Sequence, residues 1–302
     1  MNKSVKFLLL FMIAIFVLLL LNINCDWFIF FRRNKKLKLL LRKEGYSAFN
    51  PVFSPDGSKI FYLLADIGNS VKNGGHLRVI NIEGSVDRLL LDGIFGSLAI
   101  SPDGEKLILT TGDIFYDTSS IIIVDTSGVM VDTLQIEVSI KDVEFGKDIN
   151  EIYYFRNGLG FYKYSFIDSS ENLVLELNES FDELQGFDIK DDSLLFFKGI
   201  LYFLAGDSSK NFLQIFWSKF SPQSSKLLVG TTSWAFYTTG DLYLLRIDTN
   251  THEELKAIPY SHSTIVQPDW SPCGEKIVFA ANDQTGRASS TGFELWILEK
   301  IE

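Results

Sequence analysis

The chain has 302 residues, of which 46% are hydrophobic and 14% aromatic, and its formal net charge is −10. This length suffices for one large or two ordinary domains, and the many aromatic and β-branched residues, without long amphipathic helical stretches, favour an all-β fold. Residues 44–302 hold 19 basic and 37 acidic residues, a net charge of −18 that repels phosphate backbones and argues against nucleic-acid binding.

Residues 1–31 have the composition of a signal sequence or a membrane anchor. Lys3 and Lys6 precede an unbroken apolar run, Phe7–Leu21, which is the layout of a secretory signal. Two interpretations stay open. Cys25 resembles the lipidation cysteine of bacterial lipoproteins, although Asn24 stands where that family prefers a small residue. Alternatively, Phe7–Phe31 is long enough to span a bilayer as an uncleaved anchor.

The segment after this run is basic, and residues 32–35 form a juxtamembrane linker. Arg32, Arg33, Lys35, Lys36 and Lys38 outnumber the positive charges before the run, so the positive-inside rule predicts that the body lies at the cytoplasmic face of the membrane. The signal-like layout predicts export instead. We adopt export, to the periplasm or the cell surface, as the expectation.

A Ser-Pro-Asp-Gly turn recurs along the rest of the chain. In "FSPDGSKIFY", which starts at Phe53, Pro presets the first corner, Asp can accept backbone hydrogen bonds and Gly takes the left-handed position. Related segments start at Ile100, Phe145, Ile189, Phe220 and Trp270. Their spacings are 47, 45, 44, 31 and 50 residues, and clipped loops around Lys198–Gly199 account for the short step.

Each turn joins two apolar strand-like runs, and two further runs follow. The third runs are "HLRVINI", "IIIVD", "FYKYSFI", "ILYFLA" and "DLYLLRID", and the fourth, after polar turns, are "RLLL", "DTLQI", "LVLEL", "FLQIF" and "ELKAI". A four-stranded unit repeated every 40–50 residues or so is typical of a β-propeller. The last copy, "FELWILEKIE", has no fourth strand, whereas Leu37–Leu41 is an apolar run without a partner. The sequence therefore predicts a six-bladed propeller of antiparallel blades over residues 36–302, closed by an N-terminal strand that covers the last edge.

The repeated turn after an aromatic or apolar residue resembles the TolB-like, or WD40-like, propeller repeats. The resemblance covers nearly the whole chain after the N-terminal segment, and it implies the fold but little about function. TolB proper also carries an α/β domain, for which there is no room before Phe49, so we expect only the propeller of that family. The turns at Gln223–Ser224 and Cys273 depart from the Asp-Gly pattern.

The sequence contains no nucleophile elbow, phosphate-binding loop or dinucleotide-binding fingerprint. The two cysteines define no disulfide framework. Of the three histidines, His76 and His262 are expected on one strand face and His252, in a polar turn, on the other. We therefore expect no metal site and no cofactor. The segment Asp248–Glu254 lacks the glycine and terminal glutamate of a calcium loop, which favours a plain hairpin turn.

Interface-forming residue types are concentrated at one end of the predicted propeller. The crossings between blades hold Tyr46, Phe95, Phe181, Trp217, Tyr260 and His262, and the loops between second and third strands add Arg156, Trp234 and Arg287. Aromatic and arginine side chains anchor interfaces, although each ring can instead plug the channel or pack between blades. The expected function is a non-catalytic, membrane-tethered scaffold that binds a protein, peptide or ligand in the cell envelope. The alternative is an enzyme that acts on polysaccharide, a lyase or hydrolase at the channel mouth.

Overall fold

The computed structural model describes residues 36–67, 74–111, 119–136, 140–156, 158–178, 186–206, 208–212, 217–222, 226–233, 238–247, 251–255, 263–283 and 292–299. Within these ranges no helix is long and apolar enough to cross a bilayer. The part of the chain that follows Lys36 is a unit of its own. Several predicted features lie outside the described residues, namely the segments 1–31 and 32–35, Cys25, Phe181, Trp234, Tyr260, His262 and Arg287.

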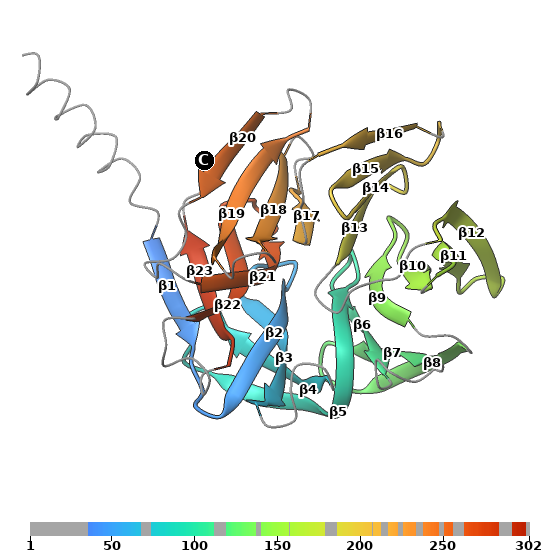
Figure 1. Cartoon of the computed structure of the whole chain (residues 1–302). Coiled ribbons are helices and arrows are strands. Elements are labelled where there is room, and N and C mark those ends of the chain that lie inside the picture. The colour runs from blue at the N-terminus through green and yellow to red at the C-terminus, as the bar shows by residue number, and fades with distance from the viewer. Residues whose placement is uncertain are drawn as a thin grey trace, which may run out of the picture. The chain divides into compact units, whose positions relative to one another are not determined.

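The described strands form several sheets, in which consecutive strands pair antiparallel (Figure 1). One sheet has seven strands: β2 (Tyr46–Phe53), β3 (Lys59–Asp66), β4 (Gly75–Asn81), β5 (Asp87–Ile100), β6 (Lys106–Thr111), β7 (Ser119–Asp125) and β8 (Met130–Ile136). The next has four: β9 (Ile140–Phe145), β10 (Glu151–Arg156), β11 (Gly160–Ser165) and β12 (Ser170–Glu176).

Three further four-stranded sheets follow along the chain. The first contains β13 (Phe187–Lys190), β14 (Leu194–Phe197), β15 (Ile200–Phe203) and β16 (Ser208–Asn211). The second contains β17 (Trp217–Phe220), β18 (Lys226–Ser233), β19 (Thr238–Arg246) and β20 (Thr251–Leu255). The third contains β21 (Ser263–Trp270), β22 (Lys276–Asp283), β23 (Glu294–Glu299) and the N-terminal strand β1 (Lys36–Leu41).

The seven-stranded sheet arises because β5 belongs to two four-stranded groups. Its first part pairs with β4 from Asp87, and its last part pairs with β6 up to Ile100. The pairing register shifts between Phe95 and Leu98, which is where the strand passes from one group to the next. The sequence predicted a separate fourth strand, a crossing and a new inner strand at this point. The crossing is short enough for one strand to continue through it, with Gly93 and Gly96 at the register shifts.

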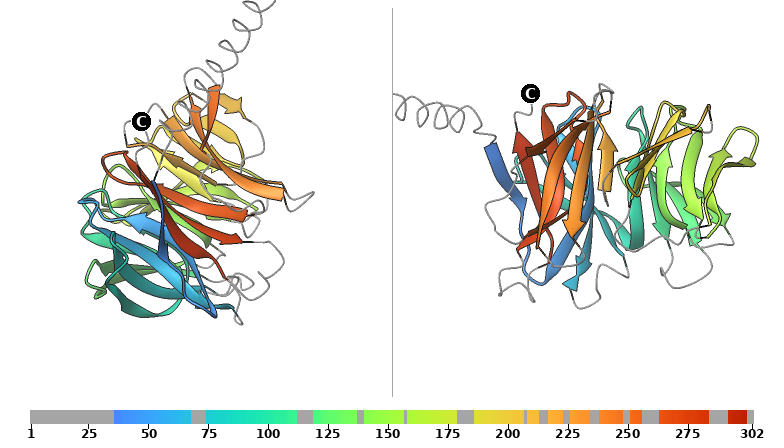
Figure 2. Two further views of the ribbon diagram at one scale, coloured as in Figure 1. Left: turned by 90° about the vertical axis from the view of Figure 1, so that its left-hand side faces the viewer. Right: turned by 45° about the horizontal axis from the view of Figure 1, so that its top comes forward.

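The innermost strands contact one another in succession. Strand β2 contacts β5, and the contacts continue through β9, β13, β17 and β21, which in turn contacts β2. Buried side chains accordingly form separate clusters, such as the one that joins Ile108 and Ile121 to Ile152 and Tyr154. Figure 2 shows the strands of neighbouring sheets side by side, with the connections gathered at their two ends. The arrangement is all-β and β-propeller-like.

One end of the sheets carries the Ser-Pro-Asp-Gly turns and the turns between third and fourth strands, and we name it the turn end. The two kinds of turn contact each other: the backbone N–H of Ile82 donates to the carbonyl of Ser58 at 3.1 Å, and that of Thr126 donates to the carbonyl of Glu105 at 3.2 Å. The opposite end, which carries the connections between sheets and those between second and third strands, is named the crossing end.

The turns repeat the same geometry. In three copies the glycine amide donates at 2.8 Å to the carbonyl of the serine that opens the turn, as Gly57 does to Ser54. The glycines have φ of 68°, 74° and 74°, which an L residue adopts only with strain. In the copy that starts at Trp270, Cys273 takes the aspartate position without changing this geometry. Its Sγ lies 3.4 Å from Ser271 Oγ.

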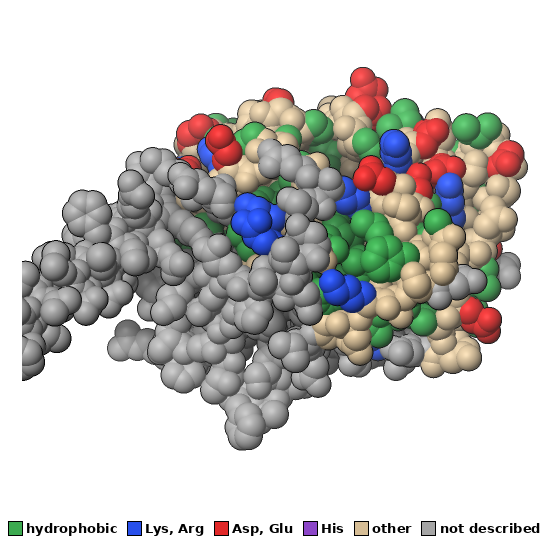
Figure 3. Space-filling view, turned by 90° about the horizontal axis from the view of Figure 1, so that it is seen from above, with side chains coloured by type: hydrophobic (Ala, Val, Ile, Leu, Met, Phe, Trp, Pro, Cys, Tyr) green, Lys and Arg blue, Asp and Glu red, His purple; other side chains and the backbone are tan. Residues whose placement is uncertain are grey.

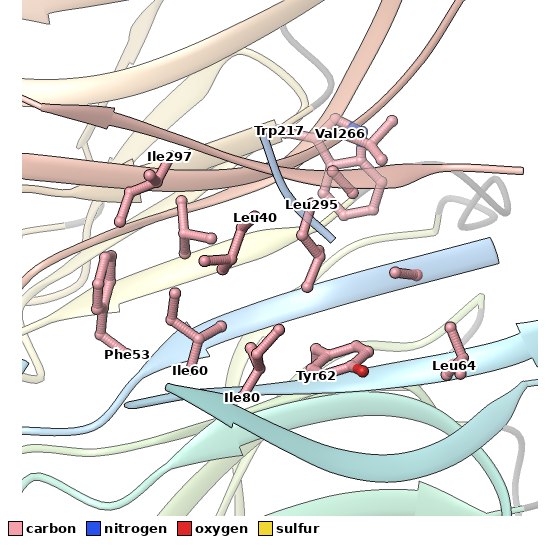
Figure 4. Packing of buried hydrophobic residues seen from close by; sticks show 13 residues of the cluster. Leu40, Phe53, Ile60, Tyr62, Leu64, Ile80, Trp217, Val266, Leu295 and Ile297 are labelled. Carbon is pink, nitrogen blue, oxygen red and sulfur yellow. The ribbon is translucent and has the colours of Figure 1, made fainter. Parts of the chain in front are cut away.

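Strand β1 completes the last sheet, in the order β1-β23-β22-β21. The prediction that Leu37–Leu41 pairs with the final strand is thereby confirmed. Leu40 is buried in a cluster with Phe53, Leu295 and Ile297 (Figure 4). Leu37 packs against a second cluster. Burying a leucine side chain stabilises a fold by about 2 kcal/mol, so this short strand contributes to holding the first and last parts of the chain together.

The outermost strands begin earlier than the sequence predicted. Strand β16 is Ser208–Asn211, where a polar turn followed by the strand "FLQIF" was expected from Phe212. Strand β20 begins at Thr251, so the backbone of His252 pairs with Leu245, and the assignment of His252 to a turn was wrong. An outermost strand has a neighbour on one side only and borders solvent. Polar residues can therefore extend it, and hydrophobicity locates its start poorly.

Candidate functional site

The structure describes four of the predicted binding residues and brings two of them to one cluster. Trp217 is 8% exposed and packs beside Val266 in the cluster of Figure 4, and Tyr46 lies partly buried against the same cluster. The ammonium of Lys43 lies 4.2 Å from the centre of the Tyr46 ring. Phe95 is buried in a different cluster. Phe95 and Trp217 therefore pack in the interior, which was the alternative role considered for each ring.

Arg156 lies apart from these rings, on β10. Its guanidinium carbon is 4.3 Å from the centre of the Tyr162 ring, and its Nη2 donates to the carboxylate of Glu171. Burial raises the pKa of Glu171. Tyr154 Oη and Arg156 Nε are buried and have no hydrogen-bond partner in the described part of the chain. Arg156 is thus held by a ring and a carboxylate of its own sheet.

A charged cluster on the innermost strands escaped the sequence analysis. Lys219 Nζ on β17 lies 2.6 Å from Glu144 Oε1 on β9 and 3.2 Å from Asp188 Oδ1 on β13. Strands β9 and β17 are not neighbours, because β13 stands between them in the succession of innermost strands. The Lys219–Glu144 contact therefore runs across the interior that these strands surround. We name Lys219, Glu144, Asp188 and Asp269 the inner charged cluster.

A signal for this cluster exists in the repeats. The residue just before each aligned repeat position is Val52, Ala99, Glu144, Asp188, Lys219 or Asp269. Residues at the same position of each repeat face the same way. Charged residues at this position in four successive repeats are unusual, because the position lies in the interior. Comparing the repeats column by column, rather than searching for motifs, would have identified them.

The carboxylates also link neighbouring innermost strands through backbone groups. Asp269 accepts the N–H of Phe53 at 2.8 Å, and Asp188 accepts that of Phe220. Asp142, two residues before Glu144 on the same strand, accepts the N–H of Phe187 at 3.2 Å. An innermost strand pairs with another strand of its sheet on one side only, so the amides on its other side need other acceptors. These three acids supply acceptors at three of the junctions and fasten β9 to β13, β13 to β17 and β21 to β2.

Burial dominates the electrostatics of this region. It raises the pKa of Asp142 and Asp269 to about 6, against the lowering effect of hydrogen bonds and of Lys219. It also raises the pKa values of Glu144 and Asp188. Burial lowers the pKa of Lys219, but the surrounding carboxylates outweigh it and raise that pKa well above its usual value.

Lys219 therefore keeps its positive charge and is the one cation that faces the several carboxyl groups of this cluster. The side chains of Lys219 and Glu144 are 22% and 17% exposed, so water reaches this pair from the interior. Among the described residues, no group of three or more His, Cys, Asp or Glu side chains is placed to hold a metal ion. On the outside, acidic side chains gather near the rim of the face in Figure 3, and Lys, Arg and apolar side chains lie between them.

The comparisons with known proteins inform the fold. No family model matches the chain, and no curated protein matches it. Solved structures do, and one of them is the hydrazine synthase of Kuenenia stuttgartiensis, a β-propeller-containing protein. It is 10% identical, with a TM-score of 0.50, and the alignment covers 80% of this chain and 78% of that chain. At this identity the likeness shows the fold alone. The chain is therefore an all-β protein with a β-propeller-like fold.

Proposed function

We propose that this chain is a six-bladed, TolB-like β-propeller, tethered to the membrane by residues 1–31, that acts outside the cytoplasm as a non-catalytic scaffold. Its crossing end would bind a protein, peptide or ligand of the cell envelope. The blade count is supported by the six copies of the turn and by the succession of innermost strands, with β5 shared between two blades. The repeated turn geometry supports the likeness to TolB.

The observation that carries the scaffold role is the use made of the inner carboxylates. Asp142, Asp188 and Asp269 each accept a backbone N–H of the next innermost strand, and Glu144 pairs with Lys219. A general acid–base pair needs carboxyl groups that face a substrate. Here the acids are engaged in joining sheets. A ring fastened in this way is stiff and presents its loops in a fixed arrangement, which lowers the entropic cost of binding.

The crossing end is the better binding surface on chemical grounds. It presents Tyr46 with Lys43 over its ring, and two exposed apolar side chains, Ile94 and Leu159. Aromatic and apolar anchors next to charged residues are typical of protein interfaces.

Photo-crosslinking in native membranes tests this proposal. A photoreactive amino acid is placed in the full chain at Ile94 or Leu159, and at Glu105 as the control on the turn end. We expect protein adducts of one defined mass from the first two positions and none from Glu105. Equal adducts from all three positions would contradict the choice of surface.

The rival function, an enzyme acting on polysaccharide, has one observation in its favour. Glu144 is partly accessible and its pKa is raised, which suits a general acid. Turnover on a panel of acidic and neutral glycans, lost in Glu144→Gln, would replace the scaffold proposal with this one. We expect no turnover.

A further inference from the structure

We infer that the turn end of the propeller lies against a lipid bilayer, with apolar turn tips at the level of the headgroups. The inference rests on the membrane tether of the proposed function. It adds which surface of the molecule meets the membrane, and it leaves the crossing end pointing away from it.

The first observation is a row of exposed apolar tips on three turns in succession along the chain. Val86 precedes β5, Val129 and Met130 lie where β8 begins, and Ile167 lies between β11 and β12. These side chains are 59%, 61%, 54% and 75% exposed, respectively. A soluble surface does not need large apolar side chains at the tips of hairpin turns, where polar residues and glycine are preferred.

The second observation is where the chain enters the propeller. Lys38 Nζ in β1 donates to the carbonyls of Ile82 and Glu83, at 3.2 and 3.0 Å, in the turn that carries Val86. Arg42, just after β1, pairs with Glu294 at the start of β23, towards the crossing end. Strand β1 therefore starts at the turn end and runs towards the crossing end.

The length of the linker turns this direction into a constraint. If the membrane segment ends at Phe31, four residues, or five Cα–Cα steps, separate it from Lys36. Five such steps span at most about 18 Å, whatever the conformation of the chain. If the chain is instead anchored through Cys25, the limit is about 40 Å for eleven steps. In the first case, and to a lesser degree in the second, the turn end is held next to the bilayer.

Weak contacts suffice under this constraint. A single valine or isoleucine inserted at an interface binds weakly, but a short tether gives it a high effective concentration at the surface.

The test uses the full chain in nanodiscs of phosphatidylcholine. A solvatochromic fluorescent amino acid is incorporated at Val129 or Ile167, and at Ile94 or Leu159 as matched controls at the crossing end. These controls are also exposed apolar positions, at 59% and 45%. Lipids that carry a spin label at the headgroup or at a shallow acyl position serve as quenchers. We expect at least threefold stronger quenching at the turn-end positions than at the controls.

The outcomes separate the inference from the tether on which it rests. A chain that stays in the nanodisc while all four positions remain unquenched overturns the inference alone. Stronger quenching at Ile94 or Leu159, or shielding of Val129 only after another protein is added, overturns it as well. A chain that is not retained by the nanodisc overturns both the inference and the tether.

Discussion

Replacing Lys219 by methionine removes the one cation of the inner charged cluster and keeps the length of the side chain. In the native protein the ammonium lies 2.6 Å from Glu144 and 3.2 Å from Asp188. Removing one partner of a buried ion pair costs about 3–5 kcal/mol, because the other charge is left buried and unpaired. Since water reaches this pair, we expect a loss near the lower limit, about 3 kcal/mol at pH 8.

The dependence on pH distinguishes this mechanism from a loss of packing. The native pKa of Asp269 is about 6 even with Lys219 lowering it, so at pH 5 this carboxyl group is mostly neutral and at pH 8 it is ionised. Without the ammonium this pKa rises further. At pH 5 the variant therefore contains no unpaired carboxylate at this position, and we expect its free energy of unfolding to lie within about 1 kcal/mol of the wild-type value.

The assay is urea unfolding of the full chain in detergent micelles, followed by tryptophan fluorescence at pH 5 and pH 8. Lys210→Met is the matched control, because Lys210 Nζ donates to the carbonyl of Ile247 at 3.0 Å. Loss of such a bond should cost about 1 kcal/mol at both pH values. An equal loss at pH 5 and pH 8 for Lys219→Met, or a loss at pH 8 no larger than that of the control, would refute the reasoning.

Three further variants test other parts of the structure. The native pKa of Asp269 is about 6, above its ordinary value near 4, so the native state binds this proton more tightly than the unfolded state does. The free energy of unfolding therefore falls by up to about 3 kcal/mol as the pH rises from 4 to 7. Urea unfolding of Asp269→Asn should lack this part of the pH dependence. In Gly186→Ala, the new Cβ would lie 2.8 Å from the Trp217 ring, and we expect thermal unfolding to show a loss of about 1–3 kcal/mol. Arg156→Lys keeps the charge but loses the planar stacking on Tyr162, and urea unfolding should show a loss of about 1 kcal/mol.

Each of these variants has its own control or contrary result. An unchanged slope between pH 4 and pH 7 in Asp269→Asn would mean that this carboxyl group titrates normally. Gly206→Ala is the control for Gly186→Ala, since the nearest atom to its Cβ would be 3.9 Å away, and we expect a change below about 0.5 kcal/mol. Wild-type stability in Arg156→Lys would show that the stacked geometry contributes nothing.

Much of the architecture was predictable because its causes are local. Each Ser-Pro-Asp-Gly turn is specified by residues that contact one another within the turn, such as Ser54 with Asp56 at 2.6 Å. The apolar runs on either side alternate as strands do, and a repeat of such units implies stacking. The closing strand was also predictable, because an apolar run without a partner and a last unit without a fourth strand complement each other.

The starts of the outermost strands were less predictable, for a reason that is also physical. Hydrophobicity marks where a strand is buried, and an outermost strand is partly exposed. Ser208–Asn211 forms β16 because its backbone pairs with β15, which its polar side chains do not reveal. For the same reason the sequence indicated a turn at His252, where the backbone belongs to β20.

The sequence by itself determined the units, their turns and the strand that closes the last sheet, because these depend on neighbouring residues or on simple complementarity. Only the tertiary structure decided that Lys219 meets a glutamate 75 positions away, that Trp217 is buried, and that β1 enters beside the turn carrying Val86. These contacts depend on the distance and rotation between sheets. That geometry is set by the packing of all the blades together, and no single unit of the sequence contains it.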